Sequence, residues 1–307
     1  MPPVQKQSKI WLDGKMINWD EANVHVLTHT LHYGMGVFEG IRCYETDDGK
    51  SAIFKLEEHI DRLYDSAHIL LMKIPFPKSE VLEACKEIFR VNKLKAGYLR
   101  PLVFLGDGEM GLYATGNTVR IAIIAWPWGA YLGDEGMKNG ISTKISSYTR
   151  HHINVTMTKS KAVANYVNSI LAKREAVLAG YEETIMLDPQ GFVSEASGEN
   201  IFVVKNGKIK TPPTTNALNG ITRNSLIQLL AEEGIEVKEA WMTRDELYIA
   251  DELFLTGTAA EITPVREVDH RQVGPGKPGP ITQKVQKIYF ELVKGKNNRD
   301  KDWLAYL

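Results

Sequence analysis

The chain has 307 residues, of which 43% are hydrophobic and 24% are charged, and its formal net charge is −1. These values are typical of a globular protein long enough for two domains, and they give no electrostatic basis for a nucleic-acid or membrane partner. Two cysteines exclude a disulfide framework or a metal cage, and no apolar run approaches the ~18 residues of a membrane span or follows a signal-peptide pattern. We therefore expect a cytoplasmic protein with free thiols and no metal.

Residues 1–125 predict a small α+β domain. Asp13-Gly14 lies between two short alternating segments, which indicates a hairpin. A glycine-rich passage then leads into a strand at Ile41–Thr46. The other predicted elements are a strand and amphipathic helix over 52–72, a helix over 78–93, and apolar strands over 97–106 and 118–126.

Residues 126–139 contain proline, glycines and no hydrophobic period, which predicts an interdomain connection. Three aromatic residues in this stretch, Trp126, Trp128 and Tyr131, are unusual for a plain linker. They indicate either that the connection lines a pocket or that it packs against one domain.

Residues 140–307 predict a larger, β-rich domain. The pattern gives a strand at 140–149, a helix over 163–179, and a β-meander with turns at Asp188-Pro189 and Asn206-Gly207. A helix over 221–233 precedes Gly234, and Thr243 with Glu246 predicts a capping box. The segment 252–265 predicts a strand with a Gly-Thr-Ala break, and the last helix spans about 282–293.

Lys161, Tyr166 and Glu195 are the residues that suggest cofactor chemistry. A lysine that forms a Schiff base must be neutral when it attacks, and Lys161 lies just before an apolar helix that also carries Tyr166. Glu195 lies among apolar strand residues, where a buried carboxylate needs a cation such as a protonated pyridine nitrogen. A surface lysine, a core tyrosine and a solvent-facing glutamate are the alternative interpretations.

Two small-residue turns predict a phosphate site. Gly220 precedes a helix whose first amides belong to Ile221 and Thr222, and the turn 256–260 offers another hydroxyl and further amides. Such turns are common, so each is weak evidence alone. The prediction of a phosphate site depends on both turns following a lysine and a carboxylate in one domain. By contrast, the basic run at 150–152 is interpreted as a solvated turn because it is so short.

A resemblance makes these fragments specific. The run from Glu195 through ASGENIF to LNGITR, which ends at Arg223, resembles the signature of the class IV aminotransferases, the fold-type IV pyridoxal phosphate enzymes, from end to end. Across essentially the whole chain, the sequence is similar to the bacterial branched-chain-amino-acid aminotransferases. The motifs that carry this wider similarity are YGMGVFEGIR (33–42), HIDRL (59–63), YLRP (98–101), PWGAYLG (127–133) and GTAAEITPV (257–265).

The resemblance implies an α+β fold of two domains with the active site in the interdomain cleft, and it implies residue roles. Lys161 would be the catalytic residue that forms the Schiff base with pyridoxal 5′-phosphate and moves the substrate proton. Tyr166 would bond the ring oxygen, Glu195 would pair with the pyridine nitrogen, and Leu218 would pack on the ring. The other implied cofactor-binding residues are Arg62, Gly220, Ile221, Thr222, Gly257 and Thr258. The implied substrate-binding residues are Tyr33, Phe38, Gly40, Tyr98, Arg100, Met110, Leu112, Trp128, Tyr131, Thr258 and Ala259, with Met110 and Leu112 acting from the loop of a second copy.

The implied reaction is reversible amino transfer from L-leucine, L-isoleucine or L-valine to 2-oxoglutarate, with ping-pong kinetics. An arginine at the pocket rim, Arg100, can meet the γ-carboxylate of glutamate and stay in water when the side chain is aliphatic. The resemblance also implies a homodimer at minimum, with a trimer of dimers as the larger alternative. The chain departs from its relatives at Val163-Ala164, where small residues are usual and valine restricts the backbone beside the lysine.

Three other functions compete with this interpretation. A D-amino-acid aminotransferase and an aminodeoxychorismate lyase share the fold, and the strand with Arg100 and the glycine-rich 33–42 loop argue against both. A non-catalytic pyridoxal phosphate-binding protein is the third, and intact Lys161 and Glu195 argue against it.

Overall fold

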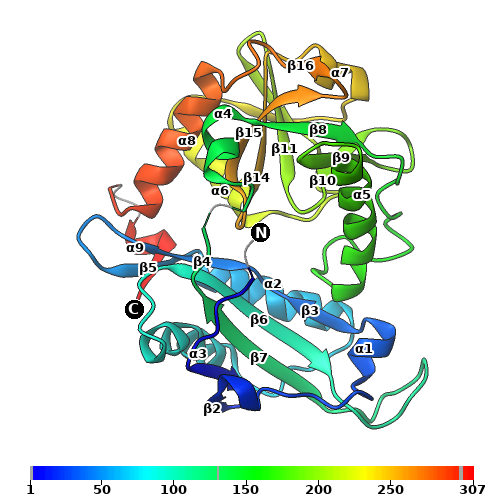
Figure 1. Ribbon diagram of the computed structural model, residues 1–307, viewed down its shortest axis with the longest axis vertical. Coiled ribbons are helices and arrows are strands. Elements are labelled where there is room, and N and C mark those ends of the chain that lie inside the picture. The colour runs from blue at the N-terminus through cyan, green and yellow to red at the C-terminus, as the bar shows by residue number, and fades with distance from the viewer. Residues whose placement is uncertain (1–2, 130, 297–299) are drawn as a thin grey trace. The chain divides into compact units, whose positions relative to one another are not determined.

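The computed structural model describes residues 3–129, 131–296 and 300–307 (Figure 1). The chain forms two compact units: Met1–Gly129 with Ser160–Ala164 and Leu292–Leu307, and Ala130–Lys159 with Asn165–Glu291. Two segments of the predicted C-terminal range therefore belong to the first unit. Their backbones explain this, because Ala162 forms a β-bridge with Val37 and the C-terminal strand pairs with a strand near residue 53.

The first unit is built on a mainly antiparallel sheet. The predicted Asp13-Gly14 hairpin is confirmed, with Lys9 opposite Asn18 in the register. Among the described residues the sheet has eight strands, in the order β17 (Leu304–Tyr306), β5 (Ser51–Phe54), β4 (Ile41–Glu45), β6 (Gly97–Leu105), β7 (Val119–Trp126), β1 (Lys9–Leu12) and β2 (Lys15–Asn18), with β3 (Gly36–Phe38) also paired to β6.

Two amphipathic helices, α2 (Leu56–Ile69) and α3 (Lys78–Val91), pack against this sheet and against each other (Figure 1). Both were predicted, α2 from its apolar spacing, and core side chains such as Ile60, Leu63 and Ile88 are fully buried. The short elements η1 (Trp19–Glu21), α1 (His29–Tyr33), α9 (Asp300–Trp303) and β3 were not predicted, because three to five residues carry no measurable period.

The second unit contains a mixed sheet. In the described part of the chain it has nine strands, in the order β10 (Val193–Ala196), β9 (Glu183–Leu187), β8 (Ile141–Ile145), β15 (Glu261–Val268), β14 (Glu252–Gly257), β11 (Asn200–Lys205), β12 (Lys208–Thr211) and β13 (Val237–Glu239), with β16 (Arg271–Gln272) paired to β15. The two predicted turns are confirmed as hairpins, β9 with β10 and β11 with β12. The prediction of one continuous meander was wrong, because β11 pairs with β14 and four strands separate β10 from β11 in the sheet. The Gly-Thr-Ala break proves to be a turn between two antiparallel strands, β14 and β15.

The helices of the second unit are α4 (Asp134–Asn139), α5 (Tyr166–Leu178), α6 (Ile221–Glu232), α7 (Arg244–Tyr248) and α8 (Pro280–Val293), the last of which ends in the segment assigned to the first unit; the 3-10 turn η2 (Val163–Asn165) precedes α5. The predicted capping box of α7 is present. The segment 126–139, predicted as an interdomain connection, contains α4 at its end, and Ala130 lies outside the described residues. Of the described helices, none is long and apolar enough to cross a membrane.

Candidate active site

Lys161 is held by its backbone on two sides within the first unit. Its N–H donates to the Ser66 hydroxyl at 3.0 Å, and its carbonyl accepts the Phe38 N–H at 3.1 Å. The Ser160 hydroxyl donates to the carbonyl of Ser66 at 3.1 Å. The Nζ atom lies 5.1 Å from the centroid of the Phe38 ring. A half-buried amine on a fixed backbone above an aromatic ring fits a reactive lysine better than it fits a mobile surface residue.

Arg100 and Tyr98 meet beside the same phenyl ring. The guanidinium carbon of Arg100 lies 4.5 Å from the Phe38 centroid, and its Nη2 donates to the Tyr98 hydroxyl at 3.1 Å. Gly40 makes room for this tyrosine, because a Cβ atom there would lie 1.9 Å from the Tyr98 oxygen. The structure thus brings these four predicted substrate residues together around a cation and a phenol that suit a carboxylate.

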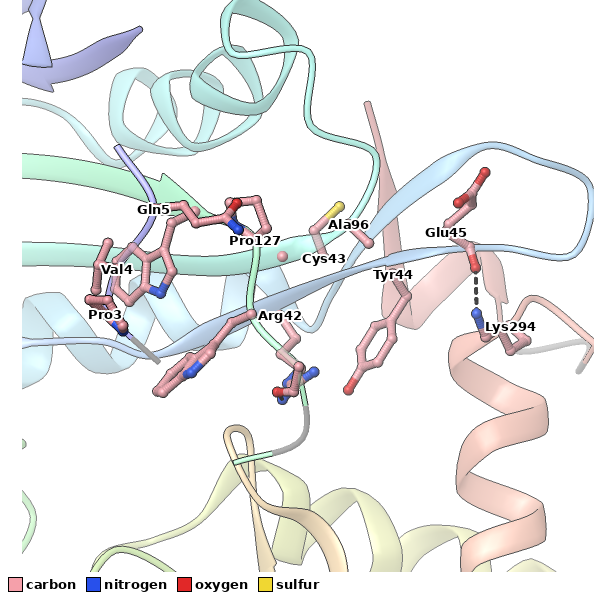
Figure 2. Close-up of a pocket in the computed structure, with 14 residues that line it drawn as sticks. Pro3, Val4, Gln5, Arg42, Cys43, Tyr44, Glu45, Ala96, Pro127 and Lys294 are labelled. Atoms are coloured by element: carbon pink, nitrogen blue, oxygen red, sulfur yellow. Dashed lines mark hydrogen bonds between the residues drawn. The ribbon is translucent and has the colours of Figure 1, made fainter. Parts of the chain in front are cut away.

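Trp128 packs edge-on against Tyr98, with ring centroids 4.3 Å apart, and it also borders a cavity of about 700 Å³ (Figure 2). Trp126 lines the same cavity, so the pocket-lining interpretation holds for these two aromatic residues. Arg42 donates from Nη2 to the carbonyl of Gly129 at 2.8 Å and so restrains the segment that carries Trp128. The position of Trp128 therefore depends on a polar contact that sequence reasoning did not identify.

Arg62, a predicted phosphate ligand, is bound to a buried carboxylate. Its Nε donates to Glu39 Oε1 at 2.7 Å and its Nη2 donates to Oε2 at 2.9 Å. His59, one turn earlier on α2, donates from Nδ1 to Glu39 Oε2 at 2.7 Å. Sequence reasoning missed Glu39, although a charged residue inside an apolar strand segment was a signal for it.

The remaining predicted residues of the first unit lie on an exposed surface. Tyr33 packs on His29 with ring centroids 4.6 Å apart, and the ring of His29 is hydrogen-bonded to the carbonyl of Gly111 at 2.9 Å. Met110 and Leu112 flank that glycine and are 43% and 94% exposed. His29 thus links α1 to the loop that carries Met110 and Leu112.

Glu195 lies in β10 of the second unit and is buried with Arg150. Arg150 Nη2 lies 2.7 Å from Glu195 Oε1, and the two residues are 7% and 5% exposed. Glu195 Oε2 accepts the backbone N–H of Leu218 at 3.1 Å and a longer bond from Asn200 at 3.4 Å. The interpretation of residue 150 as part of a solvated turn was wrong: a carboxylate buried in β10 needs a cation, and this arginine supplies it.

The start of α6, which was predicted to bind an anion, presents several hydrogen-bond donors. Gly220 caps the helix in an extended conformation, and a Cβ atom there would lie 1.9 Å from Asn200 Oδ1, so glycine is required. The helix leaves the first backbone N–H groups, including those of Ile221 and Thr222, without acceptors in the helix. Thr222 is 2% exposed, and its buried hydroxyl has no hydrogen-bond partner among the described residues. A phosphate would satisfy these donors.

The other predicted residues of this unit lie on several different elements. Leu218 is half-buried just before α6, and Tyr166 is the first residue of α5. Thr258 and Ala259 form the turn after Gly257, at the end of β14. Tyr131 lies 6.0 Å from Lys173 Nζ by its ring centroid. Asn200 joins two parts of this set, since its amide also donates to the carbonyl of Leu218 at 3.0 Å.

A second buried glutamate, Glu199, stands near Glu195 in the signature. Burial, and then the charge of Glu183, raise the pKa of Glu199 to about 8. Glu183 is itself fully buried and paired with Lys173 at 2.5 Å. The charge of Glu195 contributes in the same direction, so Glu199 is protonated at neutral pH.

The two units thus present a lysine and an arginine beside the Phe38 ring, and a buried glutamate near a helix start with open donors. The family model described as Amino-transferase class IV matches residues 36–268, and the chain belongs to that family. It is therefore an aminotransferase with the α+β fold-type IV architecture predicted from the sequence.

The relatives are more specific. The chain is 53% identical to the branched-chain-amino-acid aminotransferase of Pseudomonas aeruginosa over 99% of its length and 98% of the relative. It is 47% identical to that of Escherichia coli K12, over 98% and 97% of the two chains. The crystal structure of the Escherichia coli enzyme superposes with a TM-score of 0.95 at 46% identity, covering 97% of this chain and 99% of that one. The branched-chain amino acid aminotransferase of Thermobaculum terrenum, solved in its PLP form, has a TM-score of 0.92 at 36% identity, with 98% of each chain covered.

Proposed function

We propose that this chain is a branched-chain-amino-acid aminotransferase that transfers the amino group of L-leucine, L-isoleucine or L-valine to 2-oxoglutarate. The observation that carries the proposal is near full-length similarity to enzymes of that name, at 53% and 47% identity. The arrangement of Phe38, Tyr98 and Arg100 supports it from the chemistry, because it combines apolar and carboxylate-binding groups.

Pyridoxal 5′-phosphate is the proposed cofactor, and the residues present fit it. The unpartnered Thr222 hydroxyl and the open amides at the start of α6 suit its phosphate, and Glu195 suits its pyridine nitrogen. When bound, the cofactor supplies an electron sink for the bond broken at the substrate Cα. The structures of related enzymes with pyridoxamine 5′-phosphate or in a PLP form support this choice.

Each residue then has a defined task. Lys161 would hold the cofactor and would carry the proton to and from the substrate Cα, which its fixed backbone and flexible side chain allow. Glu195, held by Arg150, would pair with the pyridine nitrogen and favour its protonated form. Tyr98 and Arg100 orient the substrate carboxylates, and Phe38 excludes water from the aliphatic side chain.

We propose a homodimer as the working form. Met110 and Leu112 are exposed apolar residues on the loop that His29 ties to α1, and Leu31 on α1 is 64% exposed. Apolar side chains gathered on neighbouring elements are typical of a surface that a partner covers. In this proposal the loop completes the substrate pocket of the second copy.

The test is a side-by-side assay of purified protein with L-leucine, D-alanine and aminodeoxychorismate, each with 2-oxoglutarate where an acceptor is needed. The proposal predicts amino transfer from L-leucine and loss of that activity in Lys161→Ala. Transfer from D-alanine instead, or pyruvate release from aminodeoxychorismate, would identify one of the competing enzymes of this fold. A protein that binds the cofactor without turnover of any substrate would favour the non-catalytic alternative.

A further inference from the structure

Glu39 is a fully buried carboxylate between β3 and β4, and four N–H groups converge on it. Arg62 donates two of them as a side-on pair, at 2.7 and 2.9 Å, and His59 Nδ1 donates the third at 2.7 Å. The backbone N–H of Gly40 adds a longer bond at 3.3 Å. A buried charge is retained at such cost when its partners fix a particular geometry.

The charges in this cluster are well defined. Burial alone would raise the pKa of Glu39, but the charge of Arg62 and the hydrogen bonds from Arg62 and His59 outweigh it and hold the pKa far below its usual range. Burial lowers the pKa of His59, so its ring is neutral and donates from Nδ1. The cluster is therefore a carboxylate–guanidinium pair with a neutral imidazole as an additional donor.

Glu39 also connects the strand and the helix that hold Lys161. Its own N–H donates to the carbonyl of Pro101 at 2.9 Å, and the preceding residue, Phe38, bonds the backbone of Lys161. On the helix side, Ser66 bonds the Lys161 backbone and lies one turn beyond Arg62 on α2. One carboxylate thus joins the strand that contacts the lysine to the helix that carries both Arg62 and Ser66.

We propose that Glu39 is a positioning residue, which holds the Arg62 guanidinium in the plane and direction required to bind the cofactor phosphate. This inference rests on the proposed function, because it takes pyridoxal phosphate as the ligand of Arg62. The side-on pair occupies Nε and Nη2 and so fixes the whole planar group. Glutamine cannot replace the carboxylate, since it has one acceptor oxygen and its NH₂ group would face a donor of either Arg62 or His59.

The experiment measures ligand affinity in the apo protein, by equilibrium dialysis, for pyridoxal 5′-phosphate and for pyridoxal without phosphate. Glu39→Gln is expected to lower the affinity for pyridoxal phosphate about tenfold or more, since groups that orient a ligand-binding side chain typically contribute about 10–100-fold. The affinity for pyridoxal should stay within about twofold of the wild-type value. Glu58→Gln is the matched control, because Glu58 lies on the same helix, pairs with Lys55 at the surface and should change neither value. Equal weakening of both ligands, unchanged affinity or tighter phosphate binding in Glu39→Gln would overturn the proposal.

A second pair of variants serves even if Glu39→Gln fails to fold. Arg62→Gln should itself remove the phosphate preference, and adding Glu39→Gln to it should change the ratio of the two affinities by less than about twofold. A further fall of that ratio in the double variant would show that Glu39 acts by another route. Failure of the proposed function is distinguishable: a wild-type protein that binds pyridoxal phosphate but transaminates nothing contradicts the function and leaves the Glu39 result intact.

Discussion

Replacement of Arg150 by methionine should destabilise the apo protein through the glutamate that it leaves behind. Arg150 Nη2 lies 2.7 Å from Glu195 Oε1, and both side chains are nearly inaccessible to solvent. Removal of one partner from a buried ion pair costs about 3–5 kcal/mol, because the other charge stays buried without compensation. Glu195 keeps the Leu218 N–H at 3.1 Å and the longer Asn200 contact, so we expect the lower end, about 3 kcal/mol.

Two comparisons separate this mechanism from general loss of packing. The double variant Arg150→Met/Glu195→Gln should recover most of the lost free energy of unfolding, since no charge then remains unpaired. The native pair is itself incompletely satisfied, because Arg150 Nε has no partner among the described residues. Saturating pyridoxal phosphate should reduce the difference in unfolding free energy between Arg150→Met and wild type, because a cationic pyridine nitrogen would replace the guanidinium as the partner of Glu195.

The assay is urea denaturation of the apo protein, with and without cofactor, at fixed chain concentration. Arg174→Met is the control, because Arg174 lies on α5 outside the buried residues of that helix and surface changes usually stay within about 0.5 kcal/mol. The reasoning is refuted if Arg150→Met costs no more than this control, or if the double variant is as unstable as the single one.

Three further predictions concern pH, packing and specificity. Since the folded pKa of Glu199, about 8, lies above its ordinary value of 4.5, the stabilisation by its proton is full below pH 4.5 and is lost as the pH rises towards 8. The free energy of unfolding of Glu199→Gln should therefore rise relative to that of wild type by a few kcal/mol between about pH 5 and 8, at roughly 1.4 kcal/mol for each unit of pKa shift. Denaturant titrations measure this difference, and a difference that does not change with pH would contradict the prediction. Gly36→Ala should lower the free energy of unfolding by about 1–3 kcal/mol in the same assay, because its Cβ would lie 3.0 Å from Thr30 Cγ2 and 3.2 Å from Val163 Cγ2. Val163→Ala should reduce that loss, and simple additivity of the two changes would refute the contact. Arg100→Met should lower kcat/KM for L-glutamate about 30-fold, because a hydrogen bond to a charged group contributes about 1.5–3 kcal/mol, and it should leave L-leucine within about threefold; equal losses would exclude the assigned role.

Periodic elements were predictable because their signals are local. The spacing of apolar residues such as Ile60 and Leu63 defined α2, and Asp13-Gly14 defined the first hairpin. Segments whose structure depends on distant partners were not predictable in this way. The strand Leu304–Tyr306 exists because it pairs with β5, and Ser160–Ala164 joins the first unit through a bridge to Val37.

The residues of the candidate site differ in the same way in how well the sequence predicts them. Lys161, Glu195 and Thr222 could be proposed as site residues from the sequence, because each lies in a short motif of the expected chemistry. Arg150 was rejected, and Glu39 was overlooked, because each acts on a residue more than about 20 positions away. A buried charge was the signal in both cases. Once Glu195 was placed in an apolar strand, the chain had to supply a cation, and the basic run at 150–152 was a candidate for it.

The most direct test of the central claim is a half-reaction panel on the pyridoxal phosphate-loaded protein, followed by the visible absorbance of the bound cofactor. L-leucine, L-isoleucine, L-valine and L-glutamate should each convert the cofactor to its amino form, 2-oxoglutarate should restore it, and Lys161→Ala should do neither at a comparable rate. Conversion by D-alanine with no response to the branched-chain amino acids, or unimpaired conversion in Lys161→Ala, would contradict the account.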